Sequence, residues 1–228
     1  EKTSLLLGGD ATINHSNNDT RTISQRDSYS EEATYIDKDS TNKQTQSWDA
    51  QMRLEMEYQI DSMNKIILRP QIGYTHTNSA QMNDYTYDRD SVRINDGYQN
   101  KNSLQEEINA SIRAIYNHKF AKAGRALTMQ GNVSFKNTKG ETDTYAWDRM
   151  TNRALVDQYT LSGNNALNYS LRTSYVEPIY GKNHFLETAL LLSGSSRNSV
   201  KDQYTMNSLT DDYQYDSVFS NELSNNMY

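Results

Sequence analysis

The sequence predicts an all-β fold, an antiparallel up-and-down meander of about eight long strands. Three observations predict it: apolar and polar residues alternate with a period of two, short and long polar links alternate between these segments, and a polar composition is combined with many aromatic residues. The chain has 228 residues, of which 35% are hydrophobic, with 17 Tyr and only 2 Pro. Since disordered chains are poor in aromatics and rich in Pro, we expect an ordered fold with a small interior.

The alternation is strictest between Trp48 and Ile60, where even positions are apolar and odd positions are mostly polar or charged. A strand places such residues on opposite faces, whereas a helix would scatter them around its circumference. Pro70 argues against a central ladder position, and a bulge there would accommodate it. The same pattern predicts strands at residues 66–75, 104–116, 127–136 and 167–175, weaker strands at 3–14 and 185–193, and an eighth strand beginning near Tyr213.

The links between these segments alternate in length. Short links are predicted at Asp61–Lys65, Lys119–Arg125 and Pro178–Asn183, and long polar links at about Ser16–Ser47, Ser79–Ser103, Asn137–Asn165 and Ser195–Asp212. Outer-membrane barrels have tight turns at one rim and long loops at the other, and strands of about 10 to 13 residues tilted near 45° span their roughly 25 Å apolar band. The sequence therefore predicts part of a transmembrane β-barrel with short periplasmic turns and long extracellular loops.

The parity of the alternating segments assigns their residues to faces. One face is expected to meet outer-membrane lipid through Trp48, Ala50, Met52, Leu54, Met56, Tyr58, Leu68, Ile72, Ile108, Ile112, Leu127, Met129, Val133, Leu167 and Leu171. The other is expected to line a polar lumen with cross-strand ion pairs among Arg53, Glu55, Arg69, Glu107, Arg113, Lys136, Arg172 and Glu187. Aromatic girdles are expected from Trp48, Tyr58, Tyr74, Tyr116 and Tyr175. A soluble sheet with one charged face would give the same pattern.

Composition and spacing exclude several other classes of function. The net charge of -6 provides no basic footprint for nucleic acid, and the absence of Cys excludes thiolate chemistry. The four histidines lack metal-ligand spacing and are expected at the rims, and the segment Asp37–Asn42 lacks the Gly of a calcium loop. The acidic pairs Glu31-Glu32 and Asp211-Asp212 lie in polar segments with no pocket implied. We therefore expect no enzyme, no cofactor and no metal.

Several turn segments resemble a known family. The segments Lys119–Arg125, Glu177–Asn183, Gly140–Tyr145 and Ser220–Glu222 resemble the barrel of Bacteroidetes outer-membrane proteins related to TonB-dependent transporters, and the similarity extends over the whole chain. In that family the barrel has many more strands, an internal plug domain and an N-terminal carboxypeptidase-regulatory-like β-domain. The resemblance implies that residues 1–228 are one barrel segment of a larger protein, with the plug domain and the TonB system as partners. This chain has no recognisable TonB-contacting segment.

These observations support three hypotheses. The first is the barrel wall of an uptake receptor in the bacterial outer membrane, whose long loops contact an unknown external ligand. The second is a self-contained barrel of eight strands with a structural or surface-display role, and the third is a soluble β-sandwich binding module. Tyrosines in the long links either recognise a ligand or pack the hairpins on one another.

Overall fold

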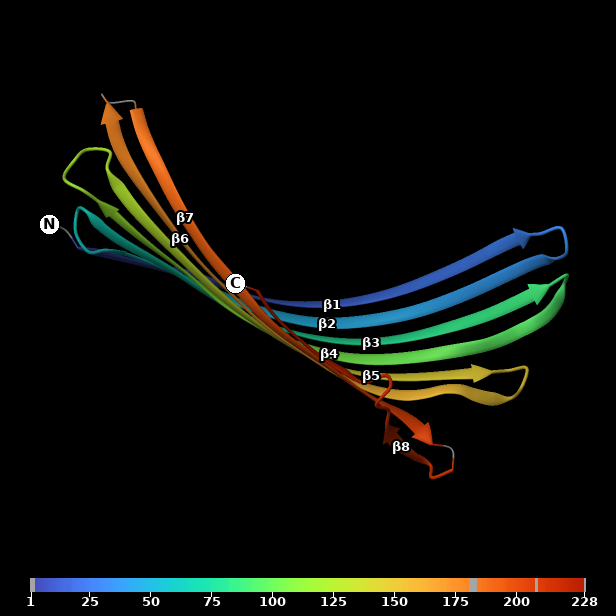
Figure 1. The fold of residues 1–228 in the computed structure, drawn as a ribbon. Helices are drawn as coiled ribbons and strands as arrows, with labels where there is room; N and C mark the ends of the chain where they lie inside the picture. Colours follow the sequence, from blue (N-terminus) through green and yellow to red (C-terminus); the bar gives the residue numbers. More distant parts are fainter. Residues whose placement is uncertain (1–2, 181–183, 208, 228) are drawn as a thin grey trace.

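The computed structural model describes residues 3–180, 184–207 and 209–227, which form one antiparallel sheet of nine strands (Figure 1). Each strand pairs with its neighbour in sequence from β1 to β8, and β9 also pairs with β7. The predicted antiparallel meander is therefore confirmed. The strands are β1 (Ser4–Tyr29), β2 (Thr34–Gln59), β3 (Asn64–Arg89), β4 (Val92–Lys119), β5 (Ala126–Asp148), β6 (Arg153–Tyr180), β7 (His184–Asn207), β8 (Asp212–Tyr215) and β9 (Asn221–Met227).

The strands are about twice as long as the sequence predicts. Strands β1 to β7 contain 23 to 28 residues each, so that the segments predicted as long loops are themselves paired strands. In the first of these segments, for example, Thr22 pairs with Thr41 and Ser28 with Tyr35. The prediction of long loops is wrong because backbone ladders do not require apolar side chains, and the Thr and Tyr of these segments favour extended structure.

Short connections join the strands at both ends of the sheet. We call the end that carries Ile60–Met63 and Phe120–Arg125 the turn end, and the end that carries Ser30–Ala33, Asp90–Ser91 and Arg149–Asn152 the hairpin end. Asp90 and Ser91 have φ angles of 49° and 67°, the left-handed pair of a two-residue type I′ hairpin. The third predicted short link begins within β6, and its residues 181–183 lie outside the described residues.

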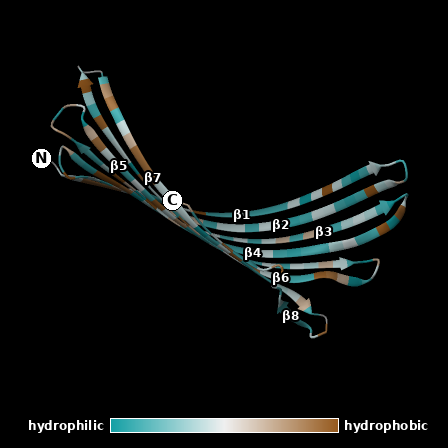
Figure 2. Cartoon of the chain, in the orientation of Figure 1, coloured by the Kyte–Doolittle hydropathy of each residue, from teal (hydrophilic) through white to brown (hydrophobic). Residues whose placement is uncertain are grey.

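The sheet is a single curved layer (Figure 1). The only hydrophobic residues that are buried among the described ones are Ala33, Ala146 and Ala166, whereas Met52 and Leu54 are 45% and 44% exposed. Figure 2 shows the hairpin end as mostly hydrophilic. Because no second layer covers the sheet within the described range, the sandwich hypothesis lacks the packed interior that it requires.

The sheet is open within the described residues. The strand order runs linearly from β1 to β8, which leaves the outer edge of β1 without a strand partner. At the opposite edge, β8 and β9 pair with β7 from Ser195 onward and leave His184–Gly194 without an outer partner. The predicted eighth strand is thus divided into β8 and β9, and Asp216–Ser220 lie between them. Strand edges of this length leave backbone N–H and C=O groups without partners, and such groups favour pairing with a further strand.

Pro70 lies inside β3, which is a central strand. The β2–β3 ladder is continuous up to the pair Arg53–Gln71 and resumes at Met56–Leu68 with the same register. The expected bulge is therefore not formed; instead, the ladder opens for two residue pairs beside the proline, which has no N–H to donate. The ion pair between Arg69 Nη2 and Glu55 Oε1, 2.9 Å apart, spans this opening.

Candidate functional site

The register places every residue of the predicted lipid-facing set on one face of the sheet, which we call the apolar face. One row crosses the sheet from β2 to β6 through Met52, Ile72, Ala110, Phe135 and Leu167. Most of these side chains are exposed, with Ile72 53% and Met52 45% accessible. Together with the flanking rows from Trp48 to Tyr58 they form a continuous apolar band on the half of the sheet toward the turn end.

Aromatic side chains border the apolar band on both sides. On the side toward the hairpin end, the rings of Trp48 and His15 stack with centroids 4.3 Å apart, and the Tyr74 hydroxyl donates to Glu106 at 3.0 Å. Of the predicted girdle, Trp48 and Tyr74 lie at this border, and Tyr58, Tyr116 and Tyr175 lie toward the turn end.

The turn-end border also contains Phe120 and Asn64, which the sequence pattern did not indicate, beside His118, one of the histidines expected at the rims. The ring of Phe120 packs edge-on against His118, with centroids 4.4 Å apart, and lies 6.1 Å from Tyr175. The Tyr116 hydroxyl donates to Asn64 at 2.7 Å, and a His118 ring nitrogen also lies 2.7 Å from that amide oxygen. Each ring therefore has an apolar body next to the band and a polar atom at its margin, the arrangement typical of interfacial aromatics.

The predicted lumen-facing residues all lie on the opposite face, which we call the polar face. Arg69 is directly opposite Arg113 on β4, and this like-charged pair is relieved because each guanidinium has another partner. Arg69 contacts Glu55, and Arg113 donates to Gln130 at 2.8 Å. The remaining members of the set lie on the same face: Arg53, Glu107, Lys136, Arg172 and Glu187.

Other contacts on the polar face cross neighbouring strands. Lys136 Nζ lies 2.9 Å from Glu107, and the Ser174 hydroxyl donates to Glu187 at 2.6 Å. Lys65 pairs with Glu57 at 2.7 Å; this contact was not predicted, because Lys65 belongs to the start of β3 and not to the predicted link Asp61–Lys65. These side chains remain partly exposed, so the pairs hold the orientation of the charged groups more than they add stability.

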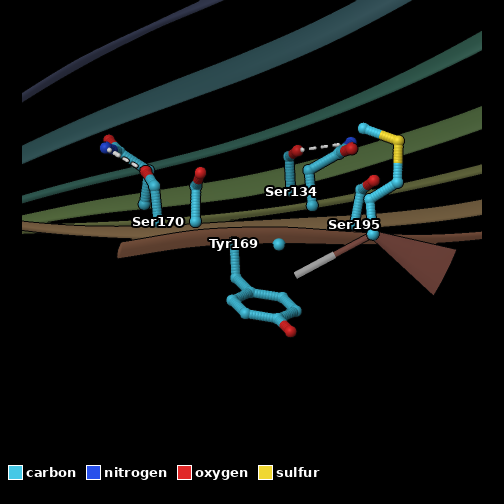
Figure 3. A pocket seen from close by; sticks show the side chains of 9 residues that line it. Ser134, Tyr169, Ser170 and Ser195 are labelled. Carbon is cyan, nitrogen blue, oxygen red and sulfur yellow. Dashed lines mark hydrogen bonds between the residues drawn. The ribbon is translucent and has the colours of Figure 1, made fainter. Parts of the chain in front are cut away.

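A hollow of about 460 Å³ lies on the polar face over β5 to β7, and Met227 of β9 completes its lining (Figure 3). Ser134, Ser170 and Ser195 point to one side of the sheet, and Tyr169 points to the other (Figure 3). The amide of Asn132 donates to Ser170 at 3.2 Å, and the amide of Asn168 donates to Ser134 at 3.3 Å. Small neutral side chains thus create space here, whereas the same face over β2 to β4 carries most of the charges.

A cluster of charged and aromatic residues lies at the hairpin end of β3 to β5. Arg149 donates to Asp84 at 2.5 Å and to Asp96 at 2.9 Å, and its guanidinium lies 5.2 Å from the Tyr98 ring centre. Arg93 pairs with Asp96 at 2.8 Å and with Asp88. Hydrogen bonds from Arg149 to both carboxylates raise the pKa of its guanidinium.

Aromatic residues continue this cluster toward β8. The rings of Tyr98 and Tyr145 have centroids 6.3 Å apart, and those of Tyr159 and Tyr204 are 6.2 Å apart. The Tyr213 hydroxyl donates to Asp157 at 2.7 Å, and this hydrogen bond raises the pKa of Tyr213 to about 12. The tyrosines of the long links therefore pack the hairpins on one another, one of the two roles that the sequence left open.

A second charged cluster lies at the turn end. Glu177 accepts hydrogen bonds from Lys122 Nζ at 2.6 Å, from Arg125 Nε at 2.7 Å and from the Tyr175 hydroxyl at 2.7 Å. Arg125 above all, and then Lys122 and Tyr175, hold the pKa of the Glu177 carboxyl well below its usual range. The β4–β5 turn is thereby attached to the end of β6.

The remaining candidate groups do not converge. In the described part of the chain, no set of His, Asp and Glu side chains is grouped so as to hold a metal ion. Asp37–Asn42, compared above with a calcium loop, is extended and lies within β2. His15, His76, His118 and His184 lie on four different strands.

Comparisons with known proteins identify no family. No family model matches the chain, and no curated protein matches it. Among solved structures, the chain is similar to the ferric citrate transporter FecA in its unliganded form, with 10% identity over 98% of this chain and 37% of that one, and a TM-score of 0.24. It is also similar to the translocator domain of the autotransporter NalP from Neisseria meningitidis, with 9% identity over 96% of this chain and 88% of that one, and a TM-score of 0.17. At these TM-scores neither match adds to the fold assignment, which rests on the strand register.

Proposed function

We propose that residues 1–228 are one segment of the wall of a large outer-membrane β-barrel, similar to TonB-dependent uptake receptors. The observation that carries this proposal is the exposed apolar band on one face of a single-layer sheet, bordered by aromatic residues and opposed by a polar face. An apolar face of this kind is costly in water but favourable in lipid, and barrels are the β-structures that span membranes.

The dimensions of the band fit a bilayer. Ten residue steps separate Trp48 from Tyr58 on β2, or about 33 Å along an extended strand. A strand tilt of about 45° reduces this to about 23 Å, which is close to the roughly 25 Å apolar band of outer-membrane barrels. We assign the turn end to the periplasm and the hairpin end to the exterior, because the longer polar part of each hairpin lies on that side.

The polar face is assigned to the barrel lumen. Its ion pairs over β2 to β4 and its neutral hollow over β5 to β7 would meet water or a plug domain, the partner that the family resemblance implies. An unknown external ligand would first meet the hairpin end, and the TonB system would supply energy to the full-length receptor. The proposal assigns this wall no catalytic role.

The open sheet favours this proposal over a self-contained barrel of eight strands. Closure of such a barrel requires β1 to pair along its length with the last strand, because a transmembrane barrel leaves no free edge. Within the described residues, β1 pairs only with β2. Strand count in the full-length protein distinguishes the two arrangements.

Cysteine accessibility tests the wall directly, since the chain contains no native Cys. In intact outer membranes, Arg53→Cys should react with a water-soluble maleimide, and Met52→Cys should be protected. Asn42→Cys and Lys43→Cys, on opposite faces of the same strand beyond the band, should both react. Equal reaction of the first two variants, with the last two as a control for labelling, would refute the membrane wall.

Uptake is tested separately on the full-length protein. Cells that carry it should deplete a solute from the medium that cells without it leave, and collapse of the proton-motive force should abolish the difference. Depletion that persists without the proton-motive force would contradict the TonB-linked part of the proposal and leave the wall intact.

A further inference from the structure

A second hollow lies on the apolar face beyond the border of the band toward the hairpin end. Its volume is about 280 Å³, and β2, β3 and β4 line it. Two rows form it: Gln44, Ala80 and Asn102 in the first, and Asn42, Met82 and Asn100 in the second. We call it the amide hollow, and we propose that it binds the neutral sugar headgroup of a membrane glycolipid, an inference that rests on the proposed membrane wall.

The level of the amide hollow places it beside lipid headgroups. Its first row lies four residues beyond the border row of Trp48, His76 and Glu106 on the same three strands. Four steps correspond to about 13 Å along a strand, or about 9 Å above the band at a tilt of about 45°. The headgroup layer begins at the edge of the apolar region and is about 5 to 8 Å thick on each side of the bilayer, so the first row lies at its outer surface, where a sugar headgroup projects toward water. Because the apolar face points outward, the hollow opens toward the neighbouring lipids.

The side chains of the amide hollow suit a polyol. Four primary amides flank a central strip of Ala80 and Met82, where Ala80 leaves space and Met82 provides an apolar floor. Each amide combines two donors with an acceptor, and a sugar hydroxyl likewise donates and accepts. Tyr145 pairs with Asn100 at the β5 end of the second row, outside the residues that line the hollow. The amides and the central strip match the alternation of hydroxyls and C–H surface on a pyranose.

The charges around the amide hollow argue against an anionic headgroup. Asp19 and Asp143 lie at the two ends of the first row, next to Gln44 and Asn102, and Arg21 lies beside Asn42 in the second row. Phosphate recognition requires clustered Arg or Lys side chains, whereas carboxylates repel phosphate. The carboxylates outnumber the guanidinium here, so a neutral hexose fits better than a phosphorylated one.

Tryptophan quenching can test this inference because the chain contains only 2 Trp. In a background in which Trp147 and every tryptophan outside residues 1–228 are replaced by Phe, Trp48 at the border row is the sole tryptophan and reports on the lipid next to the hollow. The full-length barrel would be reconstituted in phosphatidylcholine vesicles that contain either brominated glucosyl-diacylglycerol or brominated phosphatidylcholine. We expect the glycolipid to quench Trp48 at about fivefold lower concentration, the factor that one net hydrogen bond provides.

Two variants separate the hollow from the strand. Gln44→Ala combined with Asn102→Ala should abolish the preference for the glycolipid. Gln99→Ala, on the same β4 strand but on the polar face, should retain it. Retention of the preference in the double variant, or its loss in Gln99→Ala, would overturn the assignment to the amide hollow.

The lipid comparison distinguishes failure of this inference from failure of the proposed function. Equal quenching by the two lipids would overturn glycolipid binding and leave the membrane wall standing. Absence of quenching by either lipid would overturn both. Stronger quenching by a brominated phosphatidylglycerol than by the glycolipid would show that the hollow prefers an anionic headgroup. Competition by soluble methyl glucoside, without a preference for the glycolipid, would show that the hollow binds free sugars. Either result would overturn the proposal.

Discussion

Each long strand contains two halves that share one backbone ladder and differ in their side chains. On β3, the half toward the turn end carries Ile66, Leu68 and Ile72 on the apolar face, whereas the half toward the hairpin end places Ala80, Met82 and Asp84 there. The backbone pairs in both halves with the same antiparallel register. Backbone hydrogen bonding therefore determines how far the sheet extends. The side chains determine whether each half can face lipid or water.

The largest expected effect on stability comes from an arginine introduced into the apolar band, compared with an arginine introduced beyond it on the same strand. Ile72→Arg should destabilise the protein in lipid vesicles by about 2–4 kcal/mol, because an arginine near the middle of the band faces hydrocarbon. Met82→Arg, on the same strand and face, should cost about 0–1 kcal/mol because it lies beyond the band. Urea unfolding in vesicles measures both, and equal costs would remove the distinction between the halves.

Two glycines, one in each half, test whether the halves also differ in how tightly their side chains pack. At Gly97 in the hairpin half, an added Cβ would lie 2.6 Å from the Trp147 carbonyl oxygen and against Tyr85, so Gly97→Ala should cost about 1–3 kcal/mol. At Gly131 in the band half, no atom lies within 4 Å of an added Cβ, and Gly131→Ala should stabilise the strand by about 0.5–1 kcal/mol. The same unfolding measurement applies, and a penalty at Gly131 as large as at Gly97 would contradict the packing described here.

The Arg149 cluster tests how the hairpin half is held without lipid. Arg149→Met removes two carboxylate contacts and should cost about 1 kcal/mol at low salt, with less effect at high salt because the pairs are partly exposed. Amide hydrogen exchange should accelerate at the β3–β4 and β5–β6 tips and remain unchanged in the band. Lys101→Met, on the opposite face of β4, is the control, and the same acceleration in this variant would show that the Arg149 pairs do not hold the tips.

The smallest effect is the titration of Tyr213. The folded-state pKa of Tyr213 is raised from 10.0 to about 12, so its contribution to stability is complete below pH about 10 and is lost as the pH rises toward about 12. Absorbance titration should therefore show a phenol step near pH 12 that Tyr213→Phe removes and Asp157→Asn shifts downward. A step that Asp157→Asn leaves unmoved would contradict the hydrogen bond as its cause.

The positions of the apolar band and of its aromatic borders could be predicted from the sequence. Period two in residues such as Met52, Leu54 and Met56 assigns their common face once the segment is known to be a strand. The pairing register then brings these residues beside Ile72 and Leu68 of β3 without further information from side-chain chemistry. Trp48 and Tyr58 mark the limits of the band because rings with one polar atom favour its margins.

The extent of the strands could not be predicted, because polar residues such as Thr22 and Ser40 give no alternation signal when both faces are solvated. Pairing over that range depends on the partner strand opposite, which is non-local information. The contacts of Arg149 with Asp84 and of Glu177 with Lys122 were equally hidden, since they join residues far apart in sequence.

The alternation of apolar and polar residues is enough to predict strands with one apolar and one polar face, because side-chain direction along an extended backbone is a local property. The length of the strands, the single open layer of the described sheet, and the residues that form the clusters and the hollows become evident only in the folded chain. These features depend on cross-strand register, which is set by the pairing of whole strands, and no local pattern in one strand contains it.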